Sequence, residues 1–427
     1  MTEYEGGDIM IQASNELILG IELNEEYAQL TYFHPSVKEP LTLSFEPDAE
    51  NYLLPVAMRK AAGGKWELWD GTGEAAAKVT DLYRKLQTED EIEIGAERVS
   101  AEELLADYFA ACIGRLKVLT ANAQLQVMVT VRTLTERWSD LIVRALERNG
   151  LDRKRIYLQD YLSSFYYYTV NQKKELWNHD VALIEYVDEA IVGYILHIDR
   201  TTRPAIARAT EIARQPVGLD VRGEMEEADW NKERDRLFFE LLKKLFERRT
   251  VTVSYLIGDY FSKSWAERSI QYLCFKRHAY QGQNLYSKGA CYAAMERAGL
   301  IAERGILFGG RDMIQVNLQM EMRIRGKEQM YPLISAGMNW YEAHHVCEFI
   351  LDGERELRIT SQPMAEGDPI VHMMRLVGLP HRPARATRVR MTIYFSAPGC
   401  CHIEVEDLGF GEFYRSTGMV WKREIMF

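Results

Sequence analysis

The sequence predicts an α/β body followed by an all-β module, with the change of character between residues 300 and 306. Before that point, continuous or alternating apolar strand patterns recur between amphipathic helix patterns, as in strand 125–132 followed by helix 135–151. After it, short alternating strands separated by turns continue to residue 427, and no long helix pattern occurs. Strands and helices that alternate and then give way to strands alone indicate two kinds of domain in one chain.

The composition limits the function classes. The chain has 427 residues, 47% of them hydrophobic, so it can bury large cores and is expected to form two or three domains. Its formal net charge of −11 argues against a nucleic-acid partner, because neutralising phosphates requires clustered Lys and Arg. The modest basic run at 382–390 is interpreted as strand and turn surface. An acidic beginning without a signal-peptide core, and no apolar run long enough for a membrane span, predict a cytoplasmic protein without a membrane partner.

The six cysteines are scattered, and only Cys400 and Cys401 are close together. Adjacent residues of a strand point to opposite faces, so this pair is not expected to share a site. No CxxC pair occurs, and the sequence therefore supports neither a zinc site nor a disulfide framework. We expect no metal site.

The first part of the body carries clear start and stop signals. Ser100 followed by Glu103 forms a capping box before an amphipathic helix, and Gly150 is placed to end another helix. The expected elements are strands at 16–23, 27–33, 41–45 and 53–59, a strand, turn and helix within 66–86, helix 100–119, strand 125–132 and helix 135–151.

The second part of the body repeats the opening hairpin. The expected elements are a strand and helix in 155–171, a hairpin in 180–199, helix 230–249, strand 253–261 and helix 284–299, then module strands at 344–351, 356–362, 389–397 and 402–409. Helix 230–249 has one apolar stripe at positions 237, 238, 241, 242, 245 and 246. We interpret this stripe as core, with a partner surface as the alternative.

The order of these parts resembles the actin and heat-shock chaperone ATPase superfamily, in which two duplicated α/β halves clamp ATP. Residues 20–30 are similar to its first phosphate hairpin and residues 182–196 to its second. Residues 129–170 resemble the connecting segment. The stretch LIGDYFSKSW (256–265), followed by NLYSKGACYAA (284–294), resembles the adenosine strand and the helix behind it.

The module after residue 302 resembles the chaperones' peptide-binding β-sandwich, on the stretches 350–358, 376–409 and 416–421. The resemblance thus implies duplicated actin-like (ribonuclease H-like) halves at 1–175 and 176–302, and a β-sandwich at 303–427. The short spacings around the two halves imply small outer subdomains over the cleft.

The resemblance also implies site residues. The family's three acids that manage magnesium and water correspond to Glu22, Asp160 and Glu185, while Lys85 or Arg84 stands where the chaperones keep a catalytic lysine. Lys85, Asp160 and Glu185 would then be catalytic. The nucleotide cleft would contain Glu22, Asn24, Asp188, Gly258, Lys263 and Gly289.

Both phosphate turns depart from the family pattern. Phosphate cradles use glycine so that backbone N–H groups can approach the oxygens. The turn Asn24-Glu25-Glu26 and the turn 186–190 contain no glycine and carry carboxylates instead. Like unit charges 4 Å apart repel by about 4 kcal/mol at an effective dielectric near 20. We therefore expect no nucleotide cofactor, the alternative being ATP held through Mg²⁺ by the ring of acids.

These observations predict a chaperone-like binding or scaffold protein, a pseudoenzyme whose cleft does not bind ATP. The alternative is an active ATP-dependent chaperone-like ATPase that requires a divalent metal, and a filament-forming cytoskeletal protein is a third class. The expected partner is a protein or an extended peptide, and the sequence does not set the oligomeric state. Candidate peptide-binding residues, which equally suit the core of the sandwich, are Met338, Trp340, Tyr341, Phe349 and Leu351.

Overall fold

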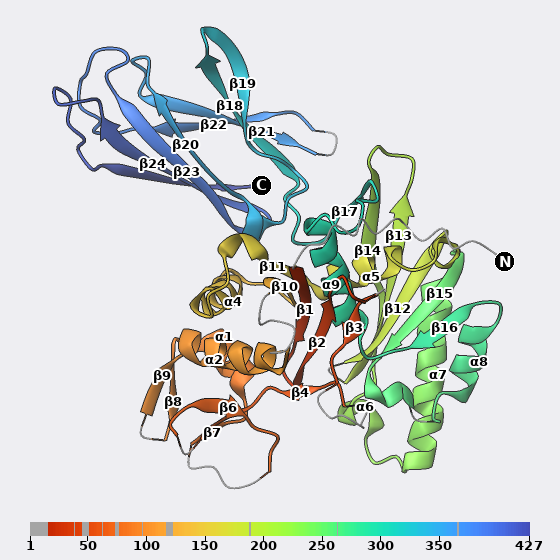
Figure 1. Ribbon diagram of the computed structural model, residues 1–427. Helices are drawn as coiled ribbons and strands as arrows, with labels where there is room; N and C mark the ends of the chain where they lie inside the picture. The colour runs from red at the N-terminus through yellow and green to blue at the C-terminus, as the bar shows by residue number, and fades with distance from the viewer. Residues whose placement is uncertain are drawn as a thin grey trace. The chain divides into compact units, whose positions relative to one another are not determined.

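The chain folds into two compact units, Met1–Phe308 and Gly309–Phe427, of which the first is mixed α/β and the second is all-β (Figure 1). The computed structural model describes residues 16–37, 39–44, 51–61, 63–72, 77–95, 97–116, 123–187, 189–262, 264–364 and 367–427. Within these ranges no helix is both long and apolar enough to cross a membrane. The predicted α/β body followed by an all-β region is confirmed at this level.

The first sheet of the α/β unit is built around β1, which pairs antiparallel with β2 and parallel with β10. In sheet order its strands are β11 (Ile156–Asp160), β10 (Gln124–Val131), β1 (Glu16–Leu23), β2 (Tyr27–Phe33) and β3 (Leu41–Thr42), with β4 (Leu54–Pro55) also paired to β2. Strands β1 and β10 are buried along most of their length, as their nearly continuous apolar sequences require.

The second sheet has the same arrangement. Its central strand β12 pairs antiparallel with β13 and parallel with β15. In sheet order its strands are β16 (His278–Gln281), β15 (Val251–Ile257), β12 (Asp180–Val187), β13 (Ala190–Asp199), β14 (Ala205–Pro216) and β17 (Ile306–Phe308). In each sheet the next two strands of the chain continue from the central strand on one side, each antiparallel to the strand before it. Two strands from later in the chain lie on the other side and run parallel to the central strand.

Two helix ends follow the predicted signals. Ser100 caps its helix by accepting a hydrogen bond from the Glu103 N–H at 3.1 Å, and Gly150 has the positive φ of +84° expected after a helix end. Among the described residues, the α-helices of the α/β unit are α1 (Leu82–Thr88), α2 (Ala101–Ile113), α4 (Glu136–Arg148), α5 (Tyr161–Val170), α6 (Leu219–Arg222), α7 (Glu227–Phe246), α8 (Glu267–Cys274) and α9 (Leu285–Arg297).

Two small regions extend from these sheets. The first contains the three-stranded sheet of β6 (Trp66–Leu68), β5 (Met58–Lys60) and β7 (Lys78–Val79), and the hairpin of β8 (Glu91–Ile94) and β9 (Glu97–Ser100). In the second, α6 and α7 lie between β14 and β15 in the chain. The whole predicted stripe of α7 is buried in one cluster with residues of β12 and β13, so the stripe is core.

Helix α9 packs against both α5 and β1 at two glycines. A Cβ on Gly289 would lie 2.0 Å from the backbone oxygen of Ser164 in α5. A Cβ on Gly20 of β1 would lie 2.3 Å from the backbone oxygen of Ser287. Both neighbours are backbone and cannot rotate away, so these glycines allow the close approach of the three elements. Gly289, which the resemblance assigns to the nucleotide cleft, is thus a helix-packing residue in the structure.

The all-β unit contains two four-stranded antiparallel sheets. One has the order β19 (Lys327–Ile334), β18 (Val316–Ile324), β21 (Glu356–Pro363), β22 (Ile370–Arg375), and the other β20 (His344–Ile350), β23 (Arg388–Ala397), β24 (Cys400–Gly409), β25 (Val420–Met426). Alternate residues are buried along β23 and β24, so this sheet has one apolar and one exposed face.

The basic run 382–390 is not wholly surface, as the sequence had suggested. Arg382 is buried and makes two hydrogen bonds, at 2.7 and 2.8 Å, to the buried carboxylate of Asp407. Asp407 also accepts hydrogen bonds from the backbone N–H groups of Gly409 and Thr417. This pair fixes the connection between β24 and β25, and an arginine that leaves water needs such a carboxylate partner.

Replacing Gly289 with alanine should lower the free energy of unfolding by about 1–3 kcal/mol, the usual cost of overpacking a core. Urea denaturation followed by circular dichroism measures the effect. Gly282→Ala is the matched control, because a Cβ there meets no atom within 4 Å. Equal stability of the two variants would contradict the packing account.

Candidate functional site

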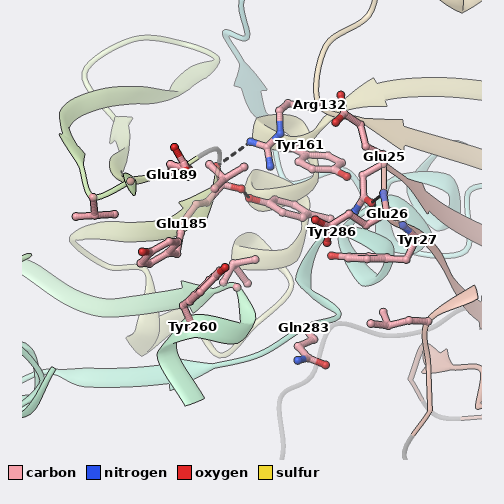
Figure 2. A pocket seen from close by; sticks show the side chains of 18 of the residues that line it. Glu25, Glu26, Tyr27, Arg132, Tyr161, Glu185, Glu189, Tyr260, Gln283 and Tyr286 are labelled. Atoms are coloured by element: carbon pink, nitrogen blue, oxygen red, sulfur yellow. Dashed lines mark hydrogen bonds and ion pairs between the residues drawn. The ribbon is translucent and has the colours of Figure 1, made fainter. Parts of the chain in front are cut away.

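A cavity of about 710 Å³ opens in the α/β unit where strands of both sheets end (Figure 2). Glu22 of β1, Arg132 after β10, Glu185 of β12 and Ile257 of β15 line it from the carboxyl ends of these strands. This is where ligands bind in open α/β sheets, and the volume falls in the usual range for small-molecule sites. We call it the acidic cavity, because its lining includes Glu22, Glu25, Glu26, Glu185, Glu189 and Glu227.

An ion pair crosses the acidic cavity. Arg132 comes from the first sheet and donates to Oε2 of Glu185 in the second sheet at 3.2 Å (Figure 2). The other oxygen of Glu185 accepts a hydrogen bond from the hydroxyl of Tyr286 in α9. The Arg132 guanidinium also lies 5.0 Å from the ring centre of Tyr161, which stacks on Tyr286 at 4.1 Å. Both oxygens of Glu185 are thus occupied by protein donors.

Glu22 is buried beside this network with 1% of its surface exposed. Its Oε1 accepts a hydrogen bond from the Tyr27 hydroxyl at 3.1 Å, whereas Oε2 is buried without a hydrogen-bond partner among the described residues. Burial raises the pKa of Glu22 to about 8, against the weaker opposing effects of Tyr27, Tyr161 and Arg132. Glu22 is therefore protonated at neutral pH, and a neutral carboxyl is a poor ligand for Mg²⁺.

In the first predicted phosphate turn, backbone N–H groups form hydrogen bonds to other atoms of the same turn. The side-chain oxygen of Asn24 accepts hydrogen bonds from the N–H groups of Glu26 at 2.9 Å and Tyr27 at 2.8 Å. The Asn24 N–H in turn donates to the Tyr27 carbonyl at 3.0 Å. In a phosphate cradle such N–H groups point at the ligand. Here they are bound within the turn, and the exposed carboxylates of Glu25 and Glu26 face the acidic cavity.

The second turn and the predicted adenosine loop also line the cavity. Glu189 has a positive φ of +55°, and its carbonyl accepts a hydrogen bond from the Val217 N–H at 2.7 Å. Gly258 has a φ of +117°, and a Cβ there would lie 2.9 Å from the Tyr186 carbonyl oxygen. The Tyr186 ring stacks on Tyr260 at 4.3 Å, so the loop presents an aromatic pair in place of a flat glycine surface.

The structure brings only part of the predicted cleft together. Glu22, Asn24, Glu185 and Gly258 line the acidic cavity, and Asp188 and Lys263 lie outside the described residues. Gly289 is at the crossing of α5 and α9.

Two of the predicted catalytic residues do not line the acidic cavity. Asp160 is buried and caps α5, accepting from the N–H and the hydroxyl of Ser163 at 2.8 and 2.6 Å. Lys85 Nζ lies 3.7 Å from Oδ1 of Asp81, the residue that precedes α1, and Lys85 borders a separate depression. On this helix Tyr83, not Lys85, faces the acidic cavity.

The predicted peptide-binding residues fall into two groups. Trp340 and Leu351 are buried, and the Trp340 indole N–H donates to Asp312 at 3.2 Å. Met338 is exposed, while Tyr341 and Phe349 are half-buried. Trp340 and Leu351 therefore belong to the core of the all-β unit, while Met338 and Tyr341 remain accessible to a partner. Half-buried Phe349 lies on the face of β20 that it shares with the buried Val389 of β23.

Several residues of the acidic cavity were not predicted from the sequence, above all Arg132, Tyr161 and Tyr286. One signal was present for Arg132, which directly follows the buried strand pattern 125–132 at the end where parallel strands place ligand-binding residues. The local sequence gives no signal that Tyr161 or Tyr286 belongs to a site. The two rings lie on different helices, α5 and α9, and come together only when the chain folds.

The fold and the cavity define a mixed α/β protein with an acidic, tyrosine-lined cavity and an all-β unit. The chain belongs to the family described as "Family of unknown function (DUF5716) C-terminal", whose model matches residues 39–310. Residues 313–427 match the model described as "Domain of unknown function (DUF8552)". No curated protein matches the sequence.

Glu22→Gln should change how stability depends on pH. An unfolded Glu has a pKa near 4.3, whereas the pKa of folded Glu22 is raised to about 8. Between these values the folded chain keeps a proton that the unfolded chain loses. Stability therefore falls as pH rises through this window, by up to about 1.4 kcal/mol per pH unit, and levels off above it.

The Gln variant lacks this loss and should gain stability relative to the native chain between about pH 5 and pH 8. Urea unfolding midpoints across this range measure the difference. Glu25→Gln, which removes an exposed carboxylate from the same cavity, controls for the loss of one negative charge. Parallel pH profiles of the native chain and Glu22→Gln would contradict the buried, protonated state of Glu22.

Proposed function

We propose that the protein is a chaperone-like binding or scaffold protein of the actin type, a pseudoenzyme whose cleft does not bind ATP. The single observation that carries this proposal is the internal ion pair of Arg132 and Glu185 in the acidic cavity. An acid that would hold magnesium in an ATPase is bonded to an arginine and a tyrosine of the same chain.

The charges around this pair support the same conclusion. Six glutamates line the cavity against three arginines, Arg132, Arg222 and Arg234. Arg132 is paired with Glu185, and Arg222 is paired with Glu227 at 3.1 Å. Glu25, Glu26 and Glu189 are exposed to the cavity, where a triphosphate would meet their like charge.

The topology supports the actin-type part of the proposal. Five strands of each sheet, β11-β10-β1-β2-β3 and β16-β15-β12-β13-β14, share one order and one set of strand directions, as two duplicated halves would. The additional strands β4 and β17 differ between the sheets. The all-β unit has two four-stranded antiparallel sheets, which suits the proposed peptide-binding β-sandwich. A shared fold does not transmit activity, so the function is argued from the cavity.

The second candidate is an ATP-dependent ATPase that requires a divalent metal. It is favoured by the cavity volume of about 710 Å³ and by the presence of Glu22 and Glu185 at the ends of the central strands. A bound metal would have to displace Arg132 and Tyr286 from Glu185 and remove the proton from Glu22. These changes oppose metal binding.

Calorimetric titration with ATP and Mg²⁺ should show no saturable binding below about 1 mM, because the cavity repels the triphosphate. A micromolar affinity would overturn the proposal in favour of the ATPase. In that case an ATPase assay of Lys85→Ala tests the predicted catalytic lysine. Unchanged ATP hydrolysis by this variant would show that Lys85 is not catalytic.

For the partner we propose an extended peptide that adds to the edge strand β20, which pairs only with β23 in its sheet. Half-buried Phe349 lies on this strand, and exposed Val346 lies on its other face.

Binding to a peptide array should be lost in Phe349→Asp and kept in Val346→Asp, because only the first change places a charge on the proposed face. Circular dichroism verifies that both variants are folded. Retention of binding by a folded Phe349→Asp would remove this face from the binding site.

A further inference from the structure

The exposed face of the second sheet of the all-β unit gathers metal-ligating side chains from two strands. Cys400 and His402 are two residues apart on β24, so both point to the same face. Glu424 of β25 is the direct register partner of His402. One ligand atom from each of these three side chains lies within 4.8 Å of the others.

The distance between the cysteine and the histidine fits a thiophilic metal. Cys400 Sγ lies 3.5 Å from His402 Nε2. Ligands at the usual zinc–sulfur and zinc–nitrogen distances are separated by about 3.6 Å when the coordination is tetrahedral. The two atoms are thus already placed as one edge of such a site.

The surroundings hold the imidazole in position. The Tyr394 ring stacks on His402 at 5.0 Å with an interplanar angle of 18°. Ser396 Oγ lies 2.7 Å from His402 Nε2, and Glu424 lies 3.9 Å from Nδ1. The side chain of Glu424 is 58% exposed, so it can turn toward a metal at small cost. Ser396 and Cys400 both contact Nε2, so Ser396 must release this nitrogen when a metal binds there, and Glu424 must move from the Nδ1 side of the ring. The stacked Tyr394 ring keeps the imidazole in place during these changes.

We propose that Cys400, His402 and Glu424 bind a zinc-class divalent ion, with water at the fourth position. Thiolate, imidazole and carboxylate form a ligand set suited to Zn²⁺, and three protein ligands with an open position match known zinc sites. The Cys400 thiol gives up its proton to solvent when the metal binds. Met426, the register partner of Cys400, adds a thioether to the same face.

This site is separate from the function proposed above, because it uses only residues of β23, β24 and β25. It replaces the expectation that the chain has no metal site. The local sequence contains no zinc motif, since Glu424 lies 22 positions after His402 and reaches it only through the strand register.

The test uses the full chain, freed of metal by a chelator and titrated with Co²⁺. Binding should produce the near-ultraviolet charge-transfer band of a cobalt–thiolate bond, and Zn²⁺ should remove it. Cys400→Ser should abolish the band, and His402→Gln should weaken Zn²⁺ binding by about tenfold or more.

Two controls make the result specific. Cys274→Ser removes an exposed cysteine elsewhere in the chain and should leave the band unchanged. Glu424→Gln should weaken binding, whereas Glu404→Gln should not, because Glu404 lies on the same face but pairs with Lys422 at 2.6 Å. No charge-transfer band in the native chain, a band that persists in Cys400→Ser, or equal effects of the two glutamate variants would overturn the proposal.

Discussion

The contact between Arg132 and Glu185 is the interaction on which the site depends. It joins the ends of strands from two sheets at the place where an α/β protein holds a ligand. Glu185 is buried, whereas 37% of the Arg132 side chain is exposed, so loss of Arg132 would leave a buried carboxylate without its charge partner. The stacked, buried rings of Tyr161 and Tyr286 lie beside the pair. The chain therefore supplies its own cation and hydrogen-bond donor to the buried carboxylate of Glu185.

The neutral state of Glu22 and the closed first turn follow the same logic. Burial raises the pKa of Glu22, and the nearby carboxylate of Glu185 adds to this effect, so Glu22 keeps its proton. Arg132 pairs with Glu185 and does not neutralise Glu22. The Asn24 side chain satisfies the N–H groups of its turn, so the turn is complete without a ligand. Close packing at Gly20 and Gly289 holds α9, and with it Tyr286, against the first sheet. Each feature stabilises the cavity in an unliganded form.

Much of the fold could be predicted because strong local patterns determined it. Strands β1 and β2 have the predicted bounds, and the Ser100 cap and the buried stripe of α7 also agree with the sequence analysis. The site was harder to predict, because its contacts join residues far apart in the chain. Arg132 and Glu185 are 53 positions apart, and Glu185 and Tyr286 are 101 apart. The family resemblance assigned catalytic roles to Lys85 and Asp160. In the structure Lys85 instead pairs with Asp81, and Asp160 caps helix α5.

The most direct test is a crystal structure of the full chain grown with Mg²⁺ and a non-hydrolysable triphosphate analogue. The account predicts that Arg132 remains bonded to Glu185 and that the turn at Asn24 keeps its internal hydrogen bonds, with no nucleotide in the cavity. A triphosphate seated there, with Glu185 released to the metal and backbone N–H groups of the turn bound to its oxygens, would contradict it.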